Sequence, residues 1–361
     1  MRRHARERTD LLARGLHRSD YAPVAPSCAT AVRQRPLPAA PRSSMSLVAA
    51  RYEEEDDVIA GLRSPRKQLP CRLLYADGGA ELFERICTLD AYYPTRTELA
   101  LLEQHLPQIA HHVGPCARVI EPGSGEGKKT RMLLHALDRP SSYVPIDIAH
   151  DQLQRMAVSL RAELPGLEIE PVTADYGAPF EIPVPQHAFK RTLVYFPGST
   201  IGNFEPAAAR TFLARLGELA GPDRLLLLGA DATRDPEVLR RAYDDELGVT
   251  AAFDKNILAH LNRARGADFD LAAFTHRAVW NAAASRVEMH LVSQRRQVVH
   301  LGREPIAFAA GEPIVTEHCY KHTPAAMHAL LATAGWRPRQ VFTAATTPFR
   351  LWLCEPIARN R

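Results

Sequence analysis

The sequence predicts an α/β fold built on a doubly wound parallel sheet, with further segments that would cap one edge of that sheet. Three observations lead to this prediction. Apolar strand-like runs alternate with helical stretches of roughly 10–15 residues between Ala117 and Asp231. A glycine-rich turn, residues 123–127, follows the first of these runs. The alternation then stops and returns only near the C-terminus, which indicates an insertion.

The expected elements follow one another in regular order. Acids or amides stand at several strand ends: Glu121 on the first strand, Asp147 on the second, Asp175 on the third and Asn203 just past the fourth. Right-handed crossovers bring these strand ends to one edge of the sheet, so we expect the functional loops there. The strands are expected at 117–122, 142–148, 167–175, 192–200 and 224–231, and the helices at about 126–136, 151–164 and 206–219.

The remaining segments divide between the sheet and the cap. Residues 234–262 are helical in pattern, whereas 275–280 and 286–299 are strand-like. A helix at 324–334 and two strands at 339–346 and 349–356 would return to the sheet as an antiparallel pair. We therefore expect a cofactor domain made of residues 109–233 and 321–361, and a cap made of residues 45–108 and 234–320.

Composition narrows the class of protein. The chain has 361 residues, 46% apolar residues and a formal charge of +4, which is too slight to argue for nucleic acid. No apolar run approaches the ~20 residues of a membrane span. Segment 1–44 is rich in Arg, Pro, Ala and Ser and has no sustained periodicity, so we expect a disordered leader. It also lacks the apolar core of a secretory signal. That leader could be an over-extended gene start before Met45, or an organellar transit peptide. A cytoplasmic protein without membrane partners is expected.

The glycine turn, VIEPGSGEGKKTR at residues 119–131, favours one kind of ligand. A phosphate-binding loop would need glycine at Pro122 and serine or threonine at Lys129, and a dinucleotide site would need glycine at Lys128. A strand-terminal acid followed by G-x-G suits S-adenosylmethionine (SAM), a sulfonium cofactor without a pyrophosphate. A plain strand–helix turn remains the alternative.

The acids at the next strand ends support a nucleoside cofactor. Asp147 lies 24 residues after Gly123 and could accept hydrogen bonds from both ribose hydroxyls. Asp175 could accept from the adenine amine. Each acid alone would fit a loop or a helix cap, but together they favour adenosine binding. An NAD site would use the same Asp147 and stays open at this point.

Longer motifs resemble one family. LFERICTLDAYYPTRTE (82–98), EPGSGEGKKTRMLL (121–134), PGSTIGNF (197–204), RAYDDELGVTAAFDKNILAHLNR (241–263) and FAAGEPIVTEHCYKH (308–322) occur in unbroken order. They resemble the histidine-specific Nα-methyltransferases of ergothioneine biosynthesis, over roughly Leu69 to Pro356. The leader before Met45 has no counterpart there.

This resemblance implies a Rossmann-like class I SAM-dependent methyltransferase with an inserted substrate-binding cap. It implies trimethylation of the α-amine of L-histidine to hercynine, with SAM as donor. The cofactor contacts that it implies are Gly123, Lys129, Asp147, Asp175 and Tyr176. The substrate contacts that it implies are Tyr92, Asn203, Tyr243, Met289, Glu317 and Cys319, with Tyr75 near the amine and Tyr75 and Asn203 as catalytic residues.

One position departs from the family pattern. The resemblance predicts serine where this chain has Cys319, and a thiol is a weaker hydrogen-bond donor and acceptor than a hydroxyl. Histidine remains the expected substrate. The alternatives are a related imidazole or aromatic amino acid as methyl acceptor, and a catalytically silent SAM-binding module.

Other ligands are not expected. His318, Cys319 and His322 invite a metal site, but no fourth ligand stands at a standard spacing. His318 and His322 also have the first spacing of the H-x-x-x-H-x-E motif of iron-dependent sulfoxide synthases, but Pro324 replaces its acid. We expect a monomer that binds SAM and an amino acid, without metal or nucleic acid.

Overall fold

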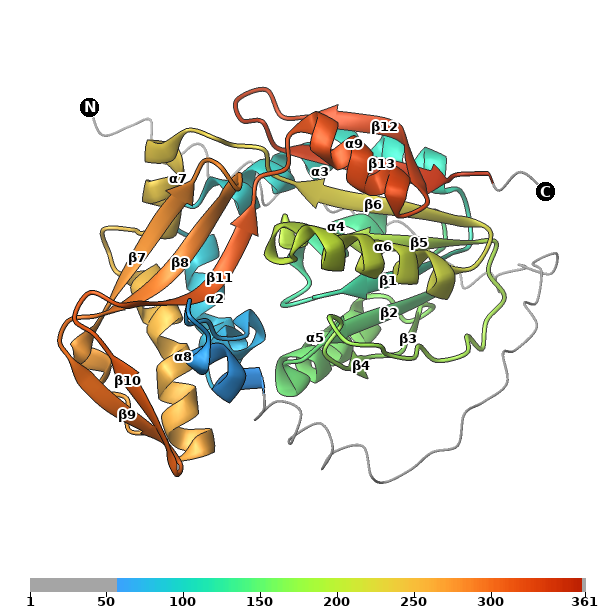
Figure 1. The fold of residues 1–361 in the computed structure, drawn as a ribbon. Helices are drawn as coiled ribbons and strands as arrows, with labels where there is room; N and C mark the ends of the chain where they lie inside the picture. The colour runs from blue at the N-terminus through green and yellow to red at the C-terminus, as the bar shows by residue number, and fades with distance from the viewer. Residues whose placement is uncertain (1–56, 359–361) are drawn as a thin grey trace, which may run out of the picture. The chain divides into compact units, whose positions relative to one another are not determined.

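The computed structural model describes residues 57–358; the expected leader, 1–44, lies outside the described residues. Figure 1 shows the arrangement of the elements. The helices are η1 (Cys71–Tyr75), α2 (Gly79–Cys87), α3 (Tyr93–Val113), α4 (Lys128–Ala136), α5 (His150–Glu163), η2 (Thr200–Asn203), α6 (Pro206–Ala220), α7 (Pro236–Tyr243), α8 (Val249–Arg265), η3 (Leu271–Ala273) and α9 (Pro324–Thr333). The strands are β1 (Ala117–Pro122), β2 (Ser142–Asp147), β3 (Glu168–Ile169), β4 (Val172–Thr173), β5 (Arg191–Phe196), β6 (Arg224–Ala230), β7 (Phe274–Asn281), β8 (Arg286–Ser293), β9 (Gln297–Leu301), β10 (Glu304–Phe308), β11 (Pro313–Tyr320), β12 (Trp336–Thr343) and β13 (Arg350–Pro356).

The main sheet confirms the predicted fold class. Its strand order is β12-β13-β6-β5-β1-β2-β3, with β4 also paired to β2. Strands β1, β2, β5 and β6 are parallel, whereas β13 is antiparallel to both β6 and β12. β1 lies between β2 and β5, so the strand order reverses there. Ligands of open α/β sheets bind at the carboxyl end of such a reversal, where this chain has its glycine turn.

Both faces of the sheet are covered, as strand β5 illustrates. Leu193 and Tyr195 pack into a cluster with side chains of α3, α4 and α5. Val194 and Phe196 pack on the other face with side chains of α6 and α9. Successive strand residues point to opposite faces, so an apolar run such as this one is expected when helices lie on both sides.

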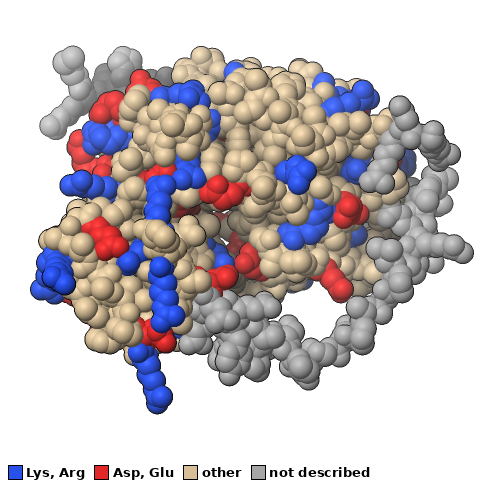
Figure 2. Space-filling view, in the orientation of Figure 1, with Lys and Arg blue, Asp and Glu red and all other residues tan. Residues whose placement is uncertain are grey.

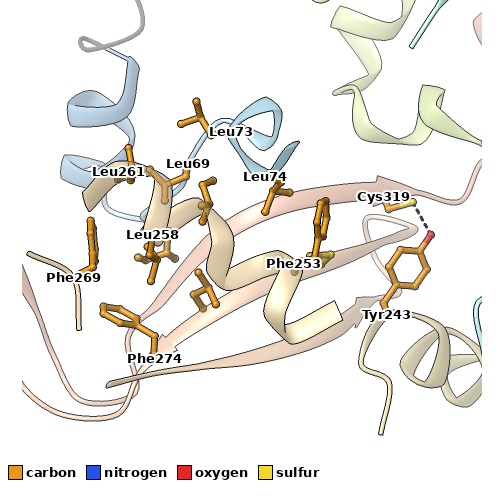
Figure 3. Close-up of a cluster of buried hydrophobic side chains, with 14 of the residues drawn as sticks. Leu69, Leu73, Leu74, Tyr243, Phe253, Leu258, Leu261, Phe269, Phe274 and Cys319 are labelled. Carbon is orange, nitrogen blue, oxygen red and sulfur yellow. Dashed lines mark hydrogen bonds between the residues drawn. The ribbon is translucent and has the colours of Figure 1, made fainter. Parts of the chain in front are cut away.

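A separate hydrophobic cluster forms within the elements outside the main sheet. Strands β11, β8 and β7 make an antiparallel three-stranded sheet, and β9 and β10 make a hairpin. Helix α8 supplies Phe253 and Leu258 to the cluster, β7 supplies Phe274, and the segment before α2 supplies Leu69 and Leu74. Figure 3 shows these side chains gathered around α8. Helices α2 and α7 pack into the same cluster through Ile86 and Leu239, and we call this whole set of elements, with η1, the cap.

Several predicted strands are wrong in extent: the strand expected at 192–200 ends at Phe196, and the one expected at 339–346 is Trp336–Thr343. Two further strands are divided. The expected strand 167–175 is interrupted between β3 and β4, where Pro171 has no N–H to donate to the sheet. The expected strand 286–299 is two strands, because a bend at residues 294–296 turns the chain from β8 into β9. These two strands belong to different sheets.

The cap helices also differ from the prediction. The expected helical stretch 234–262 is two helices, since α7 ends at Tyr243 and α8 begins after Gly248, whose φ is 71°. Asp245 accepts hydrogen bonds from the first two N–H groups of α8, with N–O distances of 3.1 and 2.7 Å. Helices α2 and α3 had no predicted element.

The predicted domain division stays a prediction. Its boundary at residue 108 falls inside helix α3, and Leu101 and Leu102 of that helix pack against the main sheet. Among residues 57–358, no helix combines the length and the apolar character that a membrane crossing requires.

Candidate active site

The turn after β1 holds its shape through glycine. Gly123, Gly125 and Gly127 have φ values of 72°, 50° and 73°, in the left-handed region that side chains disfavour. The N–H of Gly125 donates to Asp147 Oδ2 at 3.0 Å. A Cβ atom on Gly123 would lie 3.4 Å from the ring of Tyr176. The turn, Asp147 and Tyr176 therefore form one continuous surface.

Asp175 lies close to this surface, but beyond the strand on which it was expected. Strand β4 ends at Thr173, and Asp175 stands two residues later, where it accepts a hydrogen bond from the N–H of Gly177 at 2.8 Å. Its Oδ2 lies 3.7 Å from Nε of Arg72. Arg72 belongs to η1, so this ion pair brings the cap segment to the adenosine side of the turn.

Glu121 has a structural role, although it stands out in the sequence as the acid that precedes the glycine turn. Its side chain is buried, and Oε2 accepts hydrogen bonds from Thr130 at 2.7 Å and Tyr143 at 2.6 Å. Burial raises its pKa to about 8, against the opposing effect of the two hydrogen bonds. Glu121 thus fastens α4 to β1 and β2 and is not available to a ligand.

Lys129, which resemblance assigned to the cofactor, makes an ion pair in the structure. Its Nζ donates to Oε2 of the fully buried Glu98 at 2.5 Å, and the same oxygen accepts from the N–H of Gly198 at 2.8 Å. A lysine at the start of α4 opposes the helix dipole, and Glu98 offsets that cost. A contact between Lys129 and SAM stays a prediction.

Asn203 and Glu317 meet at the candidate substrate site. Asn203 ends η2, and its Nδ2 donates to Glu317 Oε1 at 3.0 Å. Glu317 pairs with Met289 across β11 and β8, so both side chains project from the same face. Burial raises the pKa of Glu317 to about 8, and the charge of Asp254 adds to this effect.

A glycine allows this meeting. A Cβ atom on Gly202 would lie 2.7 Å from the carbonyl oxygen of Tyr320 and 3.5 Å from Sγ of Cys319. Any side chain at this position would push η2 away from β11. The sequence GSTIGN therefore fixes the distance between Asn203 and Glu317.

Tyr243 and Cys319 form a second contact at this site, drawn as a dashed line in Figure 3. The Tyr243 hydroxyl lies 3.1 Å from Cys319 Sγ, and it accepts a hydrogen bond from Lys321 Nζ at 2.8 Å. The ring of Tyr92 packs edge-to-face against that of Tyr243, with centroids 5.9 Å apart. The departure at Cys319 thus lies directly beside a residue that resemblance assigned to the substrate.

Tyr75 and Tyr176 link the cofactor side to the substrate side. Burial raises the pKa of both phenols well above the ordinary value, and the charge of Glu317 contributes to each shift. Asp147 also acts on Tyr176, and Tyr176 acts on Tyr75. Both hydroxyls are therefore neutral at physiological pH and lie within electrostatic reach of Glu317.

A buried ion pair next to Tyr243 was not found from the sequence. Lys321 Nζ lies 2.9 Å from Asp231 Oδ2, and both side chains are fully buried. The Tyr93 hydroxyl donates to the same carboxylate at 2.5 Å. Burial disfavours the lysine cation, but Asp231 more than offsets this and raises the pKa of Lys321 well above its usual value. There was little indication of this pair in the sequence, because Asp231 stood out only as the last residue of an expected strand.

A second buried network also escaped the sequence reasoning. His276 Nδ1 lies 2.6 Å from Asp254 Oδ2, and its Nε2 lies 2.9 Å from the carbonyl oxygen of Tyr243. Thr316, next to Glu317, donates to Asp254 as well. Asp254 therefore supports the backbone of two predicted substrate contacts.

The suspected metal ligands point to different partners. His318 Nδ1 lies 2.6 Å from Glu205 Oε1, whereas Cys319 faces Tyr243. Within the part of the chain that the structure describes, no group of three or more His, Cys, Asp and Glu side chains could hold a metal ion.

Comparison with known proteins identifies the chemistry that this geometry serves. Residues 54–356 match the model of a family described as "Histidine-specific methyltransferase, SAM-dependent". The chain belongs to this family. Its methyl donor is SAM, as the glycine turn predicted, and the resemblance noted in the sequence is confirmed.

Individual relatives agree with the family assignment. The histidine N-alpha-methyltransferase of Mycolicibacterium smegmatis is 41% identical over 303 residues, which cover 82% of this chain and 93% of that protein. The enzyme of the same name from Mycobacterium tuberculosis is 42% identical over 287 residues, covering 77% and 87%. Ergothioneine biosynthesis protein 1 of Neurospora crassa is 34% identical over 208 residues, or 55% of this chain and 23% of that protein.

Proposed function

We propose that this histidine-specific methyltransferase transfers three methyl groups in succession from SAM to the α-amine of L-histidine. The product would be hercynine, and the reaction would be the first step of ergothioneine biosynthesis. The observation that carries the proposal is the contact between Asn203 and Glu317, which lies within electrostatic reach of Tyr176 on the cofactor surface.

The site suits an imidazole-bearing amino acid. Glu317 would accept a charge-assisted hydrogen bond from the imidazole N–H, which would take the place of the Asn203 amide. The released amide of Asn203 and the hydroxyl of Tyr243 would then hold the substrate carboxylate. An apolar side chain would leave Glu317 buried without a partner, so leucine and phenylalanine should be rejected.

The chemistry needs alignment more than acid–base strength. The lone pair of a neutral amine attacks the methyl carbon in line, the carbon–sulfur bond breaks, and the electron pair stays on sulfur. After each of the first two transfers the methylated ammonium must release a proton to become neutral again before the next attack. The positive sulfonium nearby favours the neutral amine. Tyr75, a neutral phenol, would lie near that amine, and Met289 would form an uncharged wall that tolerates added methyl groups. These roles are proposals for the residues concerned.

We also propose that the enzyme is a cytoplasmic monomer whose partners are small molecules. Figure 2 supports the absence of a nucleic-acid partner: on the face drawn, the described Lys and Arg side chains are interspersed with Asp and Glu and form no continuous basic stripe. The division into residues 109–233 plus 321–361 for SAM, and 45–108 plus 234–320 for the amino acid, is proposed on the same footing. Light scattering with and without SAM would test the monomer.

Mass spectrometry of a reaction with SAM and histidine tests the proposed reaction. We expect a product that has gained three methyl groups, and we expect mono- and dimethylhistidine to be converted to the same product. Tryptophan and tyrosine, assayed in parallel, represent the alternative that the thiol of Cys319 suggests. Turnover of an aromatic amino acid without any turnover of histidine would overturn the proposal.

A further inference from the structure

Helix α2 places a carboxylate beside the glycine turn. A Cβ atom on Gly125 would lie 3.7 Å from Oε1 of Glu84. Glu84 is half-buried, and within residues 57–358 it makes no hydrogen bond and no ion pair. A partly desolvated carboxylate without a partner is costly, so such a group at a ligand site points to a cation that the ligand supplies.

The charges around Glu84 explain why the protein itself leaves it unpaired. Burial raises its pKa to about 7; Glu126 raises it further, while Lys129 and Lys128 oppose these effects. Lys129 is bound to Glu98 instead, and no ion pair joins Glu84 to Lys128. The two lysines therefore stabilise the charged form of Glu84 electrostatically, without forming an ion pair with it.

The other partly or fully buried carboxylates at the turn are already engaged. Glu121 is buried against Thr130 and Tyr143. Asp147 binds the backbone of Gly125 and belongs to the expected ribose site. Glu126, on the turn itself, is exposed to solvent. Of the partly or fully buried acids that line the turn within the described chain, Glu84 alone faces it without a hydrogen-bond donor.

SAM carries a cation for this position. With its adenosine near Asp147 and Asp175, and its methyl group toward the cap, the methionyl end would run along the turn toward the start of α4. We propose that Glu84 accepts a hydrogen bond from the α-ammonium group of that methionyl end, so that cap helix α2 contacts the cofactor directly. The inference rests on the SAM site at the glycine turn and not on the identity of the methyl acceptor.

Binding measurements with two ligands test this assignment. S-adenosylhomocysteine carries the amino acid end, whereas 5′-methylthioadenosine keeps the adenosine and the sulfur but lacks that end. For Glu84→Gln we expect about 10-fold weaker binding of S-adenosylhomocysteine, within the range for hydrogen bonds to charged groups. Binding of 5′-methylthioadenosine should change less than about 2-fold. Glu81→Gln, an exposed acid one turn earlier on α2, should leave both affinities unchanged.

The pH dependence provides a second reading. Only the carboxylate form of Glu84 binds an ammonium, so binding of S-adenosylhomocysteine by the native enzyme should strengthen as pH rises through about 7. Glu84→Gln should lose this part of the profile. Equal weakening of both ligands would mean that Glu84 merely supports the fold, and unchanged binding of S-adenosylhomocysteine would also overturn the proposal. Because no turnover is measured, failure here is distinct from failure of the proposed histidine methylation.

Discussion

Glu317 and Asn203 are 114 residues apart in the chain, yet their side chains lie 3.0 Å apart. Neither residue is distinctive alone: an asparagine after a strand resembles a helix cap, and a glutamate in a late strand resembles a solvated face. Their contact depends on how η2 packs on β11, which no local pattern encodes. The resemblance to the family motifs identified both residues, whereas physical reasoning from the sequence could not predict that their side chains are in contact.

Replacing Glu317 by glutamine should reduce the use of histidine. The amide keeps the shape but removes the charge that strengthens the hydrogen bond to imidazole, a loss of about 1.5–3 kcal/mol. We expect kcat/KM for histidine to fall about 10- to 100-fold. Calorimetry should show unchanged binding of S-adenosylhomocysteine. An unaltered kcat/KM would remove Glu317 from the substrate site.

The same carboxyl should give histidine binding a pH dependence. The pKa of Glu317 is raised to about 8, so the carboxylate that binds the imidazole N–H becomes more populated as pH rises through that value. Histidine affinity, measured in the presence of S-adenosylhomocysteine, should therefore increase between about pH 6 and pH 9. The titration of the α-amine of histidine affects binding equally in the native protein and in Glu317→Gln, so the difference between their pH profiles reports on Glu317. Identical profiles for the two proteins would contradict the assignment.

Cys319→Ser should improve the enzyme. A hydroxyl is a stronger hydrogen-bond partner than a thiol at the position beside Tyr243. We expect KM for histidine to fall roughly 3- to 10-fold with little change in kcat, which corresponds to about 1 kcal/mol. Cys319→Ala, which removes the polar atom altogether, serves as the comparison. If serine and alanine behave alike, position 319 does not contact the substrate.

At the scale of elements, strands of the main sheet were predictable because burial on both faces gives unbroken apolar runs. Residues 117–122 became β1 as expected, and 224–231 became β6 with one residue fewer. The errors occurred where two elements share one pattern. The sequences of α7 and α8 are both helical in pattern, and the five residues 244–248, which end in the left-handed Gly248, separate the two helices. The short helix α2 went unnoticed, although it carries Glu84 to the glycine turn.

Asp254 should prove to be a positioning residue for the elements of the cap. The Asp254–His276 pair is almost fully buried, and Asp254→Asn would leave His276 without its counter-charge. We expect a loss of about 3–5 kcal/mol in the free energy of unfolding in urea. KM for histidine should rise more than kcat falls, because the backbone of Tyr243 loses its support.

An exposed pair of the same chemistry provides the control. Asp268 lies 3.0 Å from His300, with both side chains more than half exposed. Asp268→Asn should cost less than about 1 kcal/mol. Burial opposes the His276 imidazolium, but Asp254 raises the pKa of His276 overall. The contribution of the Asp254–His276 pair to the free energy of unfolding should therefore be complete below about pH 6.5 and decline as pH rises through the folded-state pKa of His276. Equal losses in the two variants would contradict a special role for Asp254.

At the scale of the whole described chain, the sheet and the cap share buried charges. Tyr93 begins α3, Asp231 follows β6, and Lys321 follows β11, yet the three meet in one cluster. Alternation of strands and helices predicts which segments belong to the sheet. It cannot predict that a lysine from one segment neutralises an aspartate from another, because such pairing depends on the complete three-dimensional arrangement.

Lys321→Met should destabilise the protein as a unit. Methionine fills a similar volume but leaves Asp231 buried without its cation, which should cost about 3–5 kcal/mol. Burial opposes both charges, but Asp231 raises the pKa of Lys321 and Lys321 lowers that of Asp231, so the native pair should contribute evenly between about pH 4 and pH 10. Chemical denaturation at several pH values measures this. Retention of full stability would show that Asp231 is neutral in the folded protein.

This shared cluster limits how the enzyme can be re-engineered. Grafting residues 234–320 from a relative with another amine specificity would keep Asp231 and Lys321, but it would replace Tyr243, to which Lys321 also donates. The incoming segment must therefore offer an acceptor at that location. Chimeras should fold well only when the grafted segment supplies tyrosine or another hydrogen-bond acceptor at position 243 to complete the cluster of Tyr93, Asp231 and Lys321.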